Sequence, residues 1–170
     1  MPTEFKPIDI RSARLDAIKL IGEDWMLVTA GDPSSWNTMT ASWGGLGVLW
    51  NRPAAFVFVR PSRHTYGFLE KSRLFTLSFF AQSFRPALEY CGRYSGREKD
   101  KAAGTGLSPF SLMEGTVSFK EASLVHVCRR LYSDDISPER FIEPSVIGEC
   151  YHEGDYHRMY VGAIEACFSR

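Results

Sequence analysis

The chain has 170 residues, of which 44% are hydrophobic, 14% aromatic and 24% charged, a composition typical of one globular domain. Its 20 basic and 20 acidic residues cancel, which argues against charge-driven binding to nucleic acid or to a membrane surface. With no apolar run of membrane-spanning length, no secretory leader and four scattered cysteines, we expect a cytoplasmic protein with reduced thiols.

The first half of the chain is predicted to alternate short strands with short helices. Apolar residues at mixed helical spacing over 9–21 predict an amphipathic helix, so that residues 1–22 form a helical extension of a single domain over 1–170. Short runs rich in apolar, β-branched and aromatic residues predict strands at 25–30, 37–43, 46–50, 54–59 and 75–80. Helices are predicted at 64–71 and 83–94.

The second half returns to strands after a glycine-rich loop with a helical turn at 95–109. Alternation over 117–132 predicts a strand that places Leu124, His126 and Cys128 on one face, and residues 158–164 predict a closing strand. Several connections are too short for a crossover helix, which favours antiparallel pairing. We therefore expect a mostly β, antiparallel barrel with accessory helices, because closure removes exposed strand edges.

The segment from Asn37 to Gly47 gathers hydroxyl-bearing residues and then three glycines between two predicted strands. Such a segment lets the backbone approach a flat ligand closely and offers N–H donors to ring heteroatoms. The alternative is a glycine-rich bulge at a barrel corner.

The segment Arg60-Pro-Ser-Arg-His-Thr65 follows a buried strand and precedes a predicted helix. Two guanidinium groups, two hydroxyls and the free N–H groups of a helix start suit a phosphate dianion. The alternative is a solvated strand end. Further along, Arg97 and Lys101 stand four residues apart in a charged loop and would share a face if the loop turned helically, although a solvated charged turn explains them equally.

Histidines and cysteines form two pairs spaced by two residues, His126 with Cys128 and Cys150 with His152. A Cys₂His₂ zinc site is conceivable if these pairs were neighbours, but buried thiols are also common core residues. The chain has no nucleophile elbow, no phosphate-binding P-loop and no glycine-rich dinucleotide fingerprint. We therefore predict no metal and no firm catalytic side chain.

Four tryptophans lie in the first third of the chain, and they are expected mainly in the core or at a dimer face. Trp43 flanks the hydroxyl-rich segment, so it could also line a ring pocket. His157 lies just before the last predicted strand, where a histidine is either solvated or placed at the mouth of a barrel.

Taken in order, these segments resemble the flavin reductase-like family with the FMN-binding split barrel. The resemblance covers residues 20 to 166 and is carried by 25–30, Asn37-Thr-Met-Thr-Ala-Ser-Trp-Gly-Gly, Asn51-Arg-Pro, Val59-Arg-Pro-Ser-Arg-His-Thr, Ser95-Gly-Arg with Asp100-Lys101, and Asp155-Tyr-His-Arg-Met-Tyr-Val-Gly-Ala-Ile. It is similar to the flavoredoxin and NAD(P)H:flavin oxidoreductase branch rather than to the pyridoxamine-phosphate oxidases.

The resemblance implies a homodimer that holds FMN near the subunit interface. The cofactor-binding residues that it implies are Asn37, Thr38, Met39, Thr40, Ala41, Ser42 and Trp43 along the ring and ribityl chain, Arg60, Ser62, Arg63 and Thr65 at the phosphate, Ser95, Arg97 and Lys101 from either subunit, and His157 near the nicotinamide side.

The implied function is an FMN-binding oxidoreductase in which NADH or NADPH reduces bound FMN. Electrons would then pass to a free flavin, a small-molecule acceptor or a redox partner protein. The first alternative is a flavin-binding carrier or store without its own nicotinamide reaction. The second is a related barrel that has exchanged FMN for haem or another ligand.

Overall fold

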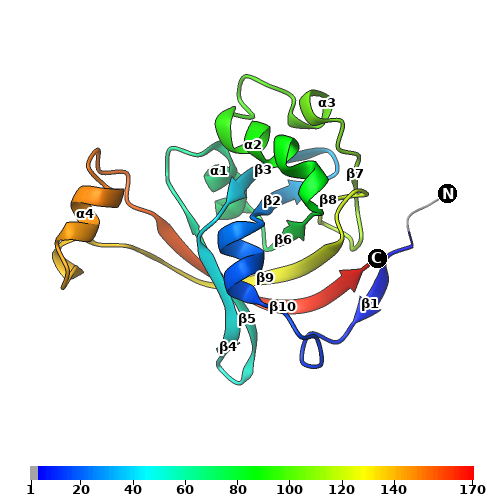
Figure 1. The fold of residues 1–170 in the computed structure, drawn as a ribbon, viewed down its shortest axis with the longest axis horizontal. Coiled ribbons are helices and arrows are strands. Elements are labelled where there is room, and N and C mark those ends of the chain that lie inside the picture. The colour runs from blue at the N-terminus through cyan, green and yellow to red at the C-terminus, as the bar shows by residue number, and fades with distance from the viewer. Residues whose placement is uncertain (1–3) are drawn as a thin grey trace.

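The computed structural model describes residues 4–170, and one large antiparallel sheet dominates it (Figure 1). Its strands are β1 (Lys6–Ile8), β2 (Met26–Asp32), β3 (Ser35–Ala41), β4 (Gly44–Leu49), β5 (Arg52–Val59), β6 (Leu74–Phe79), β9 (Leu124–Asp135) and β10 (Arg158–Ser169), and β7 (Pro109–Phe110) pairs with β8 (Ser118–Phe119) apart from it. The expected mostly β, antiparallel fold is confirmed.

Short helices occupy the connections. They are η1 (Ile18–Glu23), α1 (His64–Lys71), η2 (Gln82–Phe84), α2 (Arg85–Arg93), α3 (Lys101–Thr105), η3 (Pro138–Arg140) and α4 (Ser145–Cys150). The helices predicted at 64–71 and 83–94 and the helical turn within 95–109 are confirmed as α1, as η2 with α2, and as α3. Within residues 4–170, no helix has the length and apolar character needed to cross a membrane.

The sheet curls into a barrel that stays open along one line. Its strand order is β3-β2-β6-β9-β10-β5-β4, with β1 added on β10. The two end strands β3 and β4 are consecutive in the chain and are joined only by Ser42 and Trp43. Ala41 and Gly44 are therefore at most about 11 Å apart, since each residue advances the chain by about 3.8 Å. The opening of the barrel lies beside these two linking residues.

Residues of one strand can serve two cores, which explains the nearly continuous apolar runs. In β2, Met26 and Val28 pack into the barrel interior with residues of β5 and β6. Leu27 points to the outer face, where α2 and the β7–β8 pair cover it. Both faces are buried, so the sequence shows little of the alternation expected for a strand with one solvated face.

The β4–β5 hairpin explains the exposure of one tryptophan. Trp50 and Asn51 form its two-residue turn with φ values of 51° and 58°. Positive φ at both central positions is the type I′ pattern, which matches the twist of the paired strands. Trp50 is 51% exposed and lies edge-on to Tyr132, with ring centroids 6.2 Å apart, so it is not part of the core.

The N-terminal helix predicted at 9–21 is wrong over most of its length. Residues 6–8 form β1, which pairs with the end of β10, and Asp9 closes a turn by accepting from the backbone N–H groups of Arg11 and Ser12. The helix η1 begins only at Ile18. Pairing with an open strand edge has overridden a weak local helical pattern. Residues 1–3 of the expected extension lie outside the described part of the chain.

The predicted strand at 117–132 is interrupted by a turn at residues 120–123, between β8 and β9. The predicted faces of β9 are confirmed, because Leu124 and Cys128 pack into the barrel and Val125 packs into the outer core. After β9, residues 136–157 form an arm that carries η3 and α4 and projects from the barrel before β10 begins (Figure 1).

Candidate functional site

Two connected cavities lie at the open side of the barrel, between β3, the end of β5 and the arm. The larger has a volume of about 530 Å³ and the smaller about 170 Å³. They share Met39, Arg60 and Arg63 in their walls. The larger volume lies within the range of small-molecule sites.

The larger cavity concentrates positive charge in a protein whose net charge is zero. Five cationic side chains line it, namely Arg60, Arg63, Arg93, Arg97 and Lys101, against the two acidic residues Glu153 and Asp155. A wall with this excess of positive charge attracts anions. The cavity is therefore suited to a ligand with a negatively charged end.

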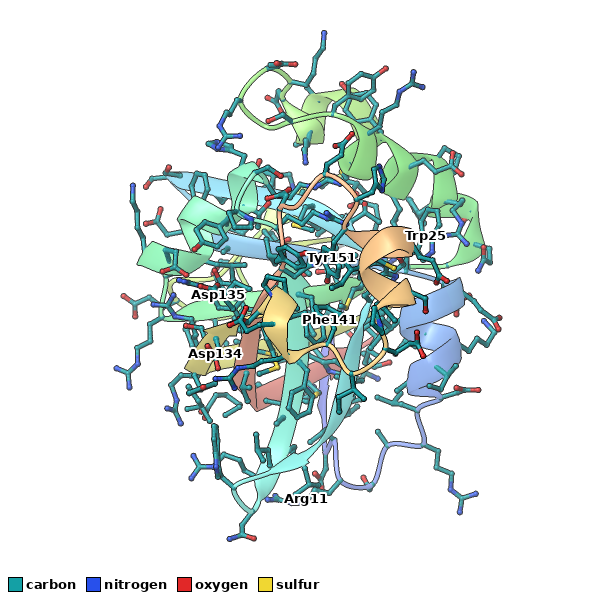
Figure 2. The ribbon with its side chains drawn as sticks, turned by 90° about the vertical axis from the view of Figure 1, so that its left-hand side faces the viewer. Arg11, Trp25, Asp134, Asp135, Phe141 and Tyr151 are labelled. Atoms are coloured by element: carbon teal, nitrogen blue, oxygen red, sulfur yellow. The ribbon has the colours of Figure 1, made fainter. Side chains whose placement is uncertain are left out.

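The segment between β5 and α1 forms one wall, and the arm holds it in place. Arg60 donates from Nη2 to the carbonyl of Cys150 at 2.9 Å and from Nη1 to the carbonyl of Asp155 at 3.2 Å. Its guanidinium group also lies 5.2 Å from the ring centre of Tyr151. In Figure 2 the arm faces the viewer, with Tyr151 and Phe141 over the barrel. These contacts bring residues about ninety positions apart to one site.

The start of α1 offers further donors. No side chain caps this helix, whose N-cap residue is Arg63. The N–H of Tyr66 donates to the Arg63 carbonyl at 3.0 Å, so the donors offered at the helix start are the N–H groups of His64 and Thr65. Arg63 donates from Nη1 to the carbonyl of Gly92 at 2.9 Å, which directs its guanidinium group along the cavity wall. Thr65 is buried, and its hydroxyl accepts from Nδ2 of Asn37 at 2.8 Å.

Lys101 is a buried cation at the base of the larger cavity. Asp100 caps α3 by accepting from the backbone N–H of Ala103, which places Lys101 at the first position of the helix. Its Nζ donates to the carbonyls of Thr38 and Cys91 at 2.6 and 2.7 Å. Burial lowers the pKa of Lys101 to about 8, and the nearby charge of Arg63 acts in the same direction.

Arg97 reaches the same cavity from outside α3. It lies in the turn at residues 96–98, and its Nη1 donates to the carbonyl of Ser62 at 3.2 Å. Arg97 and Lys101 therefore do not share a helical face, although both line the cavity. The solvated-turn interpretation is wrong for Lys101, which is buried.

The smaller cavity is lined by the aromatic rings of Trp43, Phe58 and His157. His157 is buried beside Trp43, with ring centroids 5.1 Å apart, and its Nδ1 lies 2.8 Å from the hydroxyl of Tyr151. Burial, assisted by Arg60 and Arg63, lowers the pKa of His157 to about 4. The imidazole is therefore neutral at physiological pH, and the interpretation of His157 as a solvated loop residue is wrong.

Fourteen of the fifteen residues that the sequence singled out line these two cavities. They are Asn37, Met39, Thr40, Ala41, Ser42, Trp43, Arg60, Ser62, Arg63, Thr65, Ser95, Arg97, Lys101 and His157. Thr38 lines neither, because its hydroxyl is buried 2.8 Å from that of Thr29. Gly44 turns away to pair with β5, where a Cβ would come within 2.7 Å of the Phe56 carbonyl.

Several other lining residues were not among the predicted cofactor-binding residues, although Cys150 and His152 had been considered as metal ligands. They include His64, Arg93, Tyr94, Gly96, Cys150, His152, Glu153, Asp155 and Phe58. His64 and Gly96 lie inside segments already recognised, and Asp155 lies two residues before His157. The arm residues could not be placed from the sequence because the fold of 133–157 was not predicted.

The conceivable Cys₂His₂ site does not form. His126 and Cys128 lie inside β9, whereas Cys150 ends α4 on the arm. Nδ1 of His126 instead lies 2.9 Å from Sγ of Cys167. Within residues 4–170, no group of three or more histidine, cysteine or acidic residues could hold a metal ion, and all four cysteines are free.

A model of the flavin reductase like domain matches residues 20–170, most of the chain. The chain belongs to the flavin reductase-like domain family. Both cavities and the opening of the barrel lie inside the matched range, so the resemblance in the sequence is confirmed at the level of the family. No protein of curated function matches this flavin reductase-like chain significantly.

Solved structures confirm the split-barrel fold of this flavin reductase-like domain. One is the FMN-binding domain of a flavin reductase-like enzyme from Shewanella baltica, with a TM-score of 0.71 at 15% identity over 99% of this chain and 78% of that chain. The flavoredoxin of Desulfovibrio vulgaris gives a TM-score of 0.67 at 21% identity over 96% and 76% of the two chains. An NADH:FAD oxidoreductase of Streptomyces globisporus, solved with NAD and FAD fragments, gives 0.64 at 15% identity over 86% and 74%.

Proposed function

We propose that the protein binds FMN in the two connected cavities and uses it to pass reducing equivalents from NADH or NADPH to an acceptor. The observation that carries this proposal is the larger cavity, whose cationic wall shares Met39, Arg60 and Arg63 with the smaller cavity between β3 and His157. One end thus suits a phosphate and the other an aromatic ring. Family membership and the likeness to FMN-binding structures support the same ligand.

The residues present fit the phosphate end of FMN. Arg60, Arg63 and Arg97 carry guanidinium groups that can pair with phosphate oxygens, and the uncapped start of α1 adds backbone donors. Lys101 adds a charge at the base of the cavity. These groups would hold the phosphate, since charge-assisted hydrogen bonds are the stronger class of polar contact.

The residues of the smaller cavity fit a flat ring. Strand β3 ends at Ala41, and Ser42 and Trp43 continue past the barrel opening with no strand beside them in the sheet order. Their backbone would run along the ring, with Met39 and Thr40 at its other end. Neutral His157, fixed between Trp43 and Tyr151, would shield the ring from water without adding charge.

Bound FMN supplies hydride acceptance and release, and the protein supplies position and electrostatics. Arg60 and Arg63 stand where the two cavities meet, so they orient the phosphate end relative to the ring end. His64 and His157 remain neutral near pH 7, because burial lowers the pKa of both. No side chain is required as a proton donor in this proposal.

The first test is the visible absorption spectrum of the purified, dialysed protein before and after adding FMN. A flavin band that is retained or reconstituted, and shifted from free FMN, would support binding. Arg60→Ala with Arg63→Ala should weaken FMN by about 3 kcal/mol or more, because two charge-assisted contacts are lost. Arg14→Ala, which removes an exposed cation outside both cavities, is the control. Unchanged FMN affinity in the double variant would contradict the assignment.

The second test concerns the electron donor. Anaerobic mixing of the FMN-loaded protein with NADH and, separately, NADPH should bleach the flavin band within seconds with at least one of them. Absence of bleaching with both, despite bound FMN, would leave a carrier or store reduced by a partner protein. A band typical of haem, or no response to FMN at all, would contradict FMN binding itself.

We also propose that the protein acts as a homodimer in the cytoplasm. Large apolar side chains are exposed in the single chain, with Trp43, which lines the smaller cavity, 46%, Tyr132 45% and Ile142 99% exposed. Burying such side chains against a second copy would remove them from water. The free state of all four cysteines fits a reducing compartment. Sedimentation equilibrium should give twice the chain mass, and a monomer with full FMN affinity would contradict the dimer.

A further inference from the structure

The carboxylate of Asp155 already occupies hydrogen-bond donors that an anionic ligand would use. Oδ2 of Asp155 accepts from the hydroxyl of Ser62 at 2.5 Å, and Oδ1 accepts from the backbone N–H of Ser62 at 3.3 Å. Ser62 stands between Arg60 and Arg63 in the segment that leads into α1. A carboxylate and a phosphate share negative charge and oxygen acceptors, so both select the same donors.

The arm holds this carboxylate in place through its backbone. The carbonyls of Cys150 and Asp155 both accept from Arg60, which fixes the loop between them against the end of β5. Asp155 itself has a φ of 54°, in the left-handed region that asparagine and aspartate tolerate better than most residues. The contact with Ser62 is therefore made from a backbone position that the surrounding contacts maintain.

Asp155 and Glu153 are the two acidic residues among those lining the larger cavity, and they differ in what they contact. The side chain of Glu153 is 87% exposed, and its nearest ionic contact is His152 at 3.9 Å. Asp155 instead engages Ser62 with both oxygens. A phosphate bound to Ser62 would have to displace Asp155 or share its donor with a like charge.

We propose that Asp155 is a specificity-determining residue that competes with the ligand's phosphate for Ser62, so that FMN binds weakly enough to exchange as a substrate. This inference rests on the proposed function. Competition with Asp155 therefore weakens the binding of the phosphate and leaves the binding of the ring unchanged. The affinity for riboflavin, a flavin without a phosphate, is not reduced.

The test compares the wild type, Asp155→Asn and Glu153→Gln, each titrated with FMN and with riboflavin by quenching of flavin fluorescence. Asp155→Asn keeps the size of the side chain and removes its charge. It should increase the affinity for FMN about tenfold, slow FMN release by a similar factor and change the affinity for riboflavin less than twofold. Glu153→Gln removes an equal charge from the same cavity without freeing Ser62, so it should change the affinity for FMN less than threefold.

A double-mutant cycle with Ser62 tests the shared donor directly. In the wild type the hydroxyl of Ser62 is engaged by Asp155, so Ser62→Ala should cost little FMN affinity. In the Asp155→Asn protein the hydroxyl is free for the phosphate, so Ser62→Ala should cost several-fold more. An equal cost in both backgrounds would overturn the proposal.

Other outcomes are also decisive. Unchanged or weaker FMN binding by Asp155→Asn, an equal gain for riboflavin, or an equal gain from Glu153→Gln would each overturn the competition. These results leave FMN binding by the wild type intact and thus separate the two proposals. Failure of every protein to bind either flavin would instead remove the proposed function, and this inference with it. Circular dichroism of each variant confirms that the fold is retained.

Discussion

His126 and His157 are both buried, and burial lowers the pKa of each to about 4, yet they lie in regions of very different character. His126 is inside β9, edge-on to Phe79, with Nδ1 against Sγ of Cys167 and with no hydrogen-bond partner for Nε2 among the described residues. His157 precedes β10, contacts the hydroxyl of Tyr151 and lines a cavity.

This difference shows that a shifted pKa does not by itself identify a functional site. Around His126 the buried thiols are also pushed towards their neutral forms, since burial raises the pKa of Cys167 to about 12 and that of Cys128 well above its usual value. His126 lines neither of the two cavities of the site. At the cavity, in contrast, buried groups stand beside arginines and open space, so their protonation can alter binding.

The largest expected effect is a loss of stability on overpacking the core of the β9–β10 region at Gly162. Gly162 lies on β10 at a register shift, where an added Cβ would come within 2.6 Å of Cζ of Phe75 and 3.0 Å of Cβ of Cys128. Gly162→Ala should lower the free energy of unfolding by about 3 kcal/mol, because a tightly packed core cannot yield at both contacts. Urea denaturation measures this loss, and the FMN affinity of the folded fraction should not change.

The matched variant at the cavity is Gly96→Ala. Its added Cβ would overlap Oδ1 of Asn37, the far end of a side chain that also donates to Thr65. A side-chain end can move more readily than the packed atoms around Gly162, so the free energy of unfolding should fall by only about 1 kcal/mol. FMN affinity should fall instead. An equal loss of stability in both variants would contradict the contrast between the regions.

The core histidine should contribute to the pH dependence of stability, as should His157, whose pKa is equally low. An unfolded histidine binds a proton below a pKa of about 6.5, whereas folded His126 stays neutral down to about 4. Its stabilising contribution is therefore complete above pH 6.5 and is lost as the pH falls towards 4. Between pH 7 and pH 5 it should cost the wild type about 2 kcal/mol of unfolding free energy.

His126→Gln provides the comparison for this prediction, because glutamine is polar and does not titrate. The difference in unfolding free energy between the wild type and this variant, followed by urea denaturation from pH 7 to pH 5, should shrink by the amount expected from His126. A difference that stays constant over this range would mean that folded His126 takes up its proton as the unfolded chain does, so that burial does not lower its pKa.

Much of this architecture follows from local pattern, and the exceptions have physical causes. Strands β5 and β6 and the helix from His64 to Lys71 could be predicted, because each shows the local sequence pattern of its own type of element. Strand β1 was missed because it exists only through its pairing with Cys167 and its neighbours on β10. Local periodicity carries no information about such a partner.

The same limit applies to the site. The cations of the segment from Arg60 to Thr65 were predicted from their place between a strand and a helix, and they line the larger cavity. The contact between Ser62 and Asp155 joins residues 93 positions apart, and it depends on how the arm returns to the barrel. The burial of Lys101 likewise depends on carbonyls from β3 and α2, which no local spacing reveals.

The last of the expected effects tests Lys101, which is buried like His126 but faces the cavity. Its pKa is about 8, so its charge is nearly complete at pH 7 and mostly lost at pH 9. If only the charged form attracts the phosphate, FMN affinity should fall about tenfold over that range, or about 1.4 kcal/mol. Fluorescence titrations at fixed ionic strength between pH 7 and pH 9 measure this change.

Lys101→Met isolates the contribution of this charge. Of the groups around it, Cys91 and His64 do not titrate in the same range, since burial raises the pKa of Cys91 to about 11 and lowers that of His64 below its usual value. The variant should bind FMN at every pH about as weakly as the wild type does at pH 9. An unchanged slope in the variant would place the titrating group elsewhere. A flat wild-type profile would mean that FMN binding does not change the protonation of Lys101 between pH 7 and pH 9, which would contradict a role for its charge in holding the phosphate.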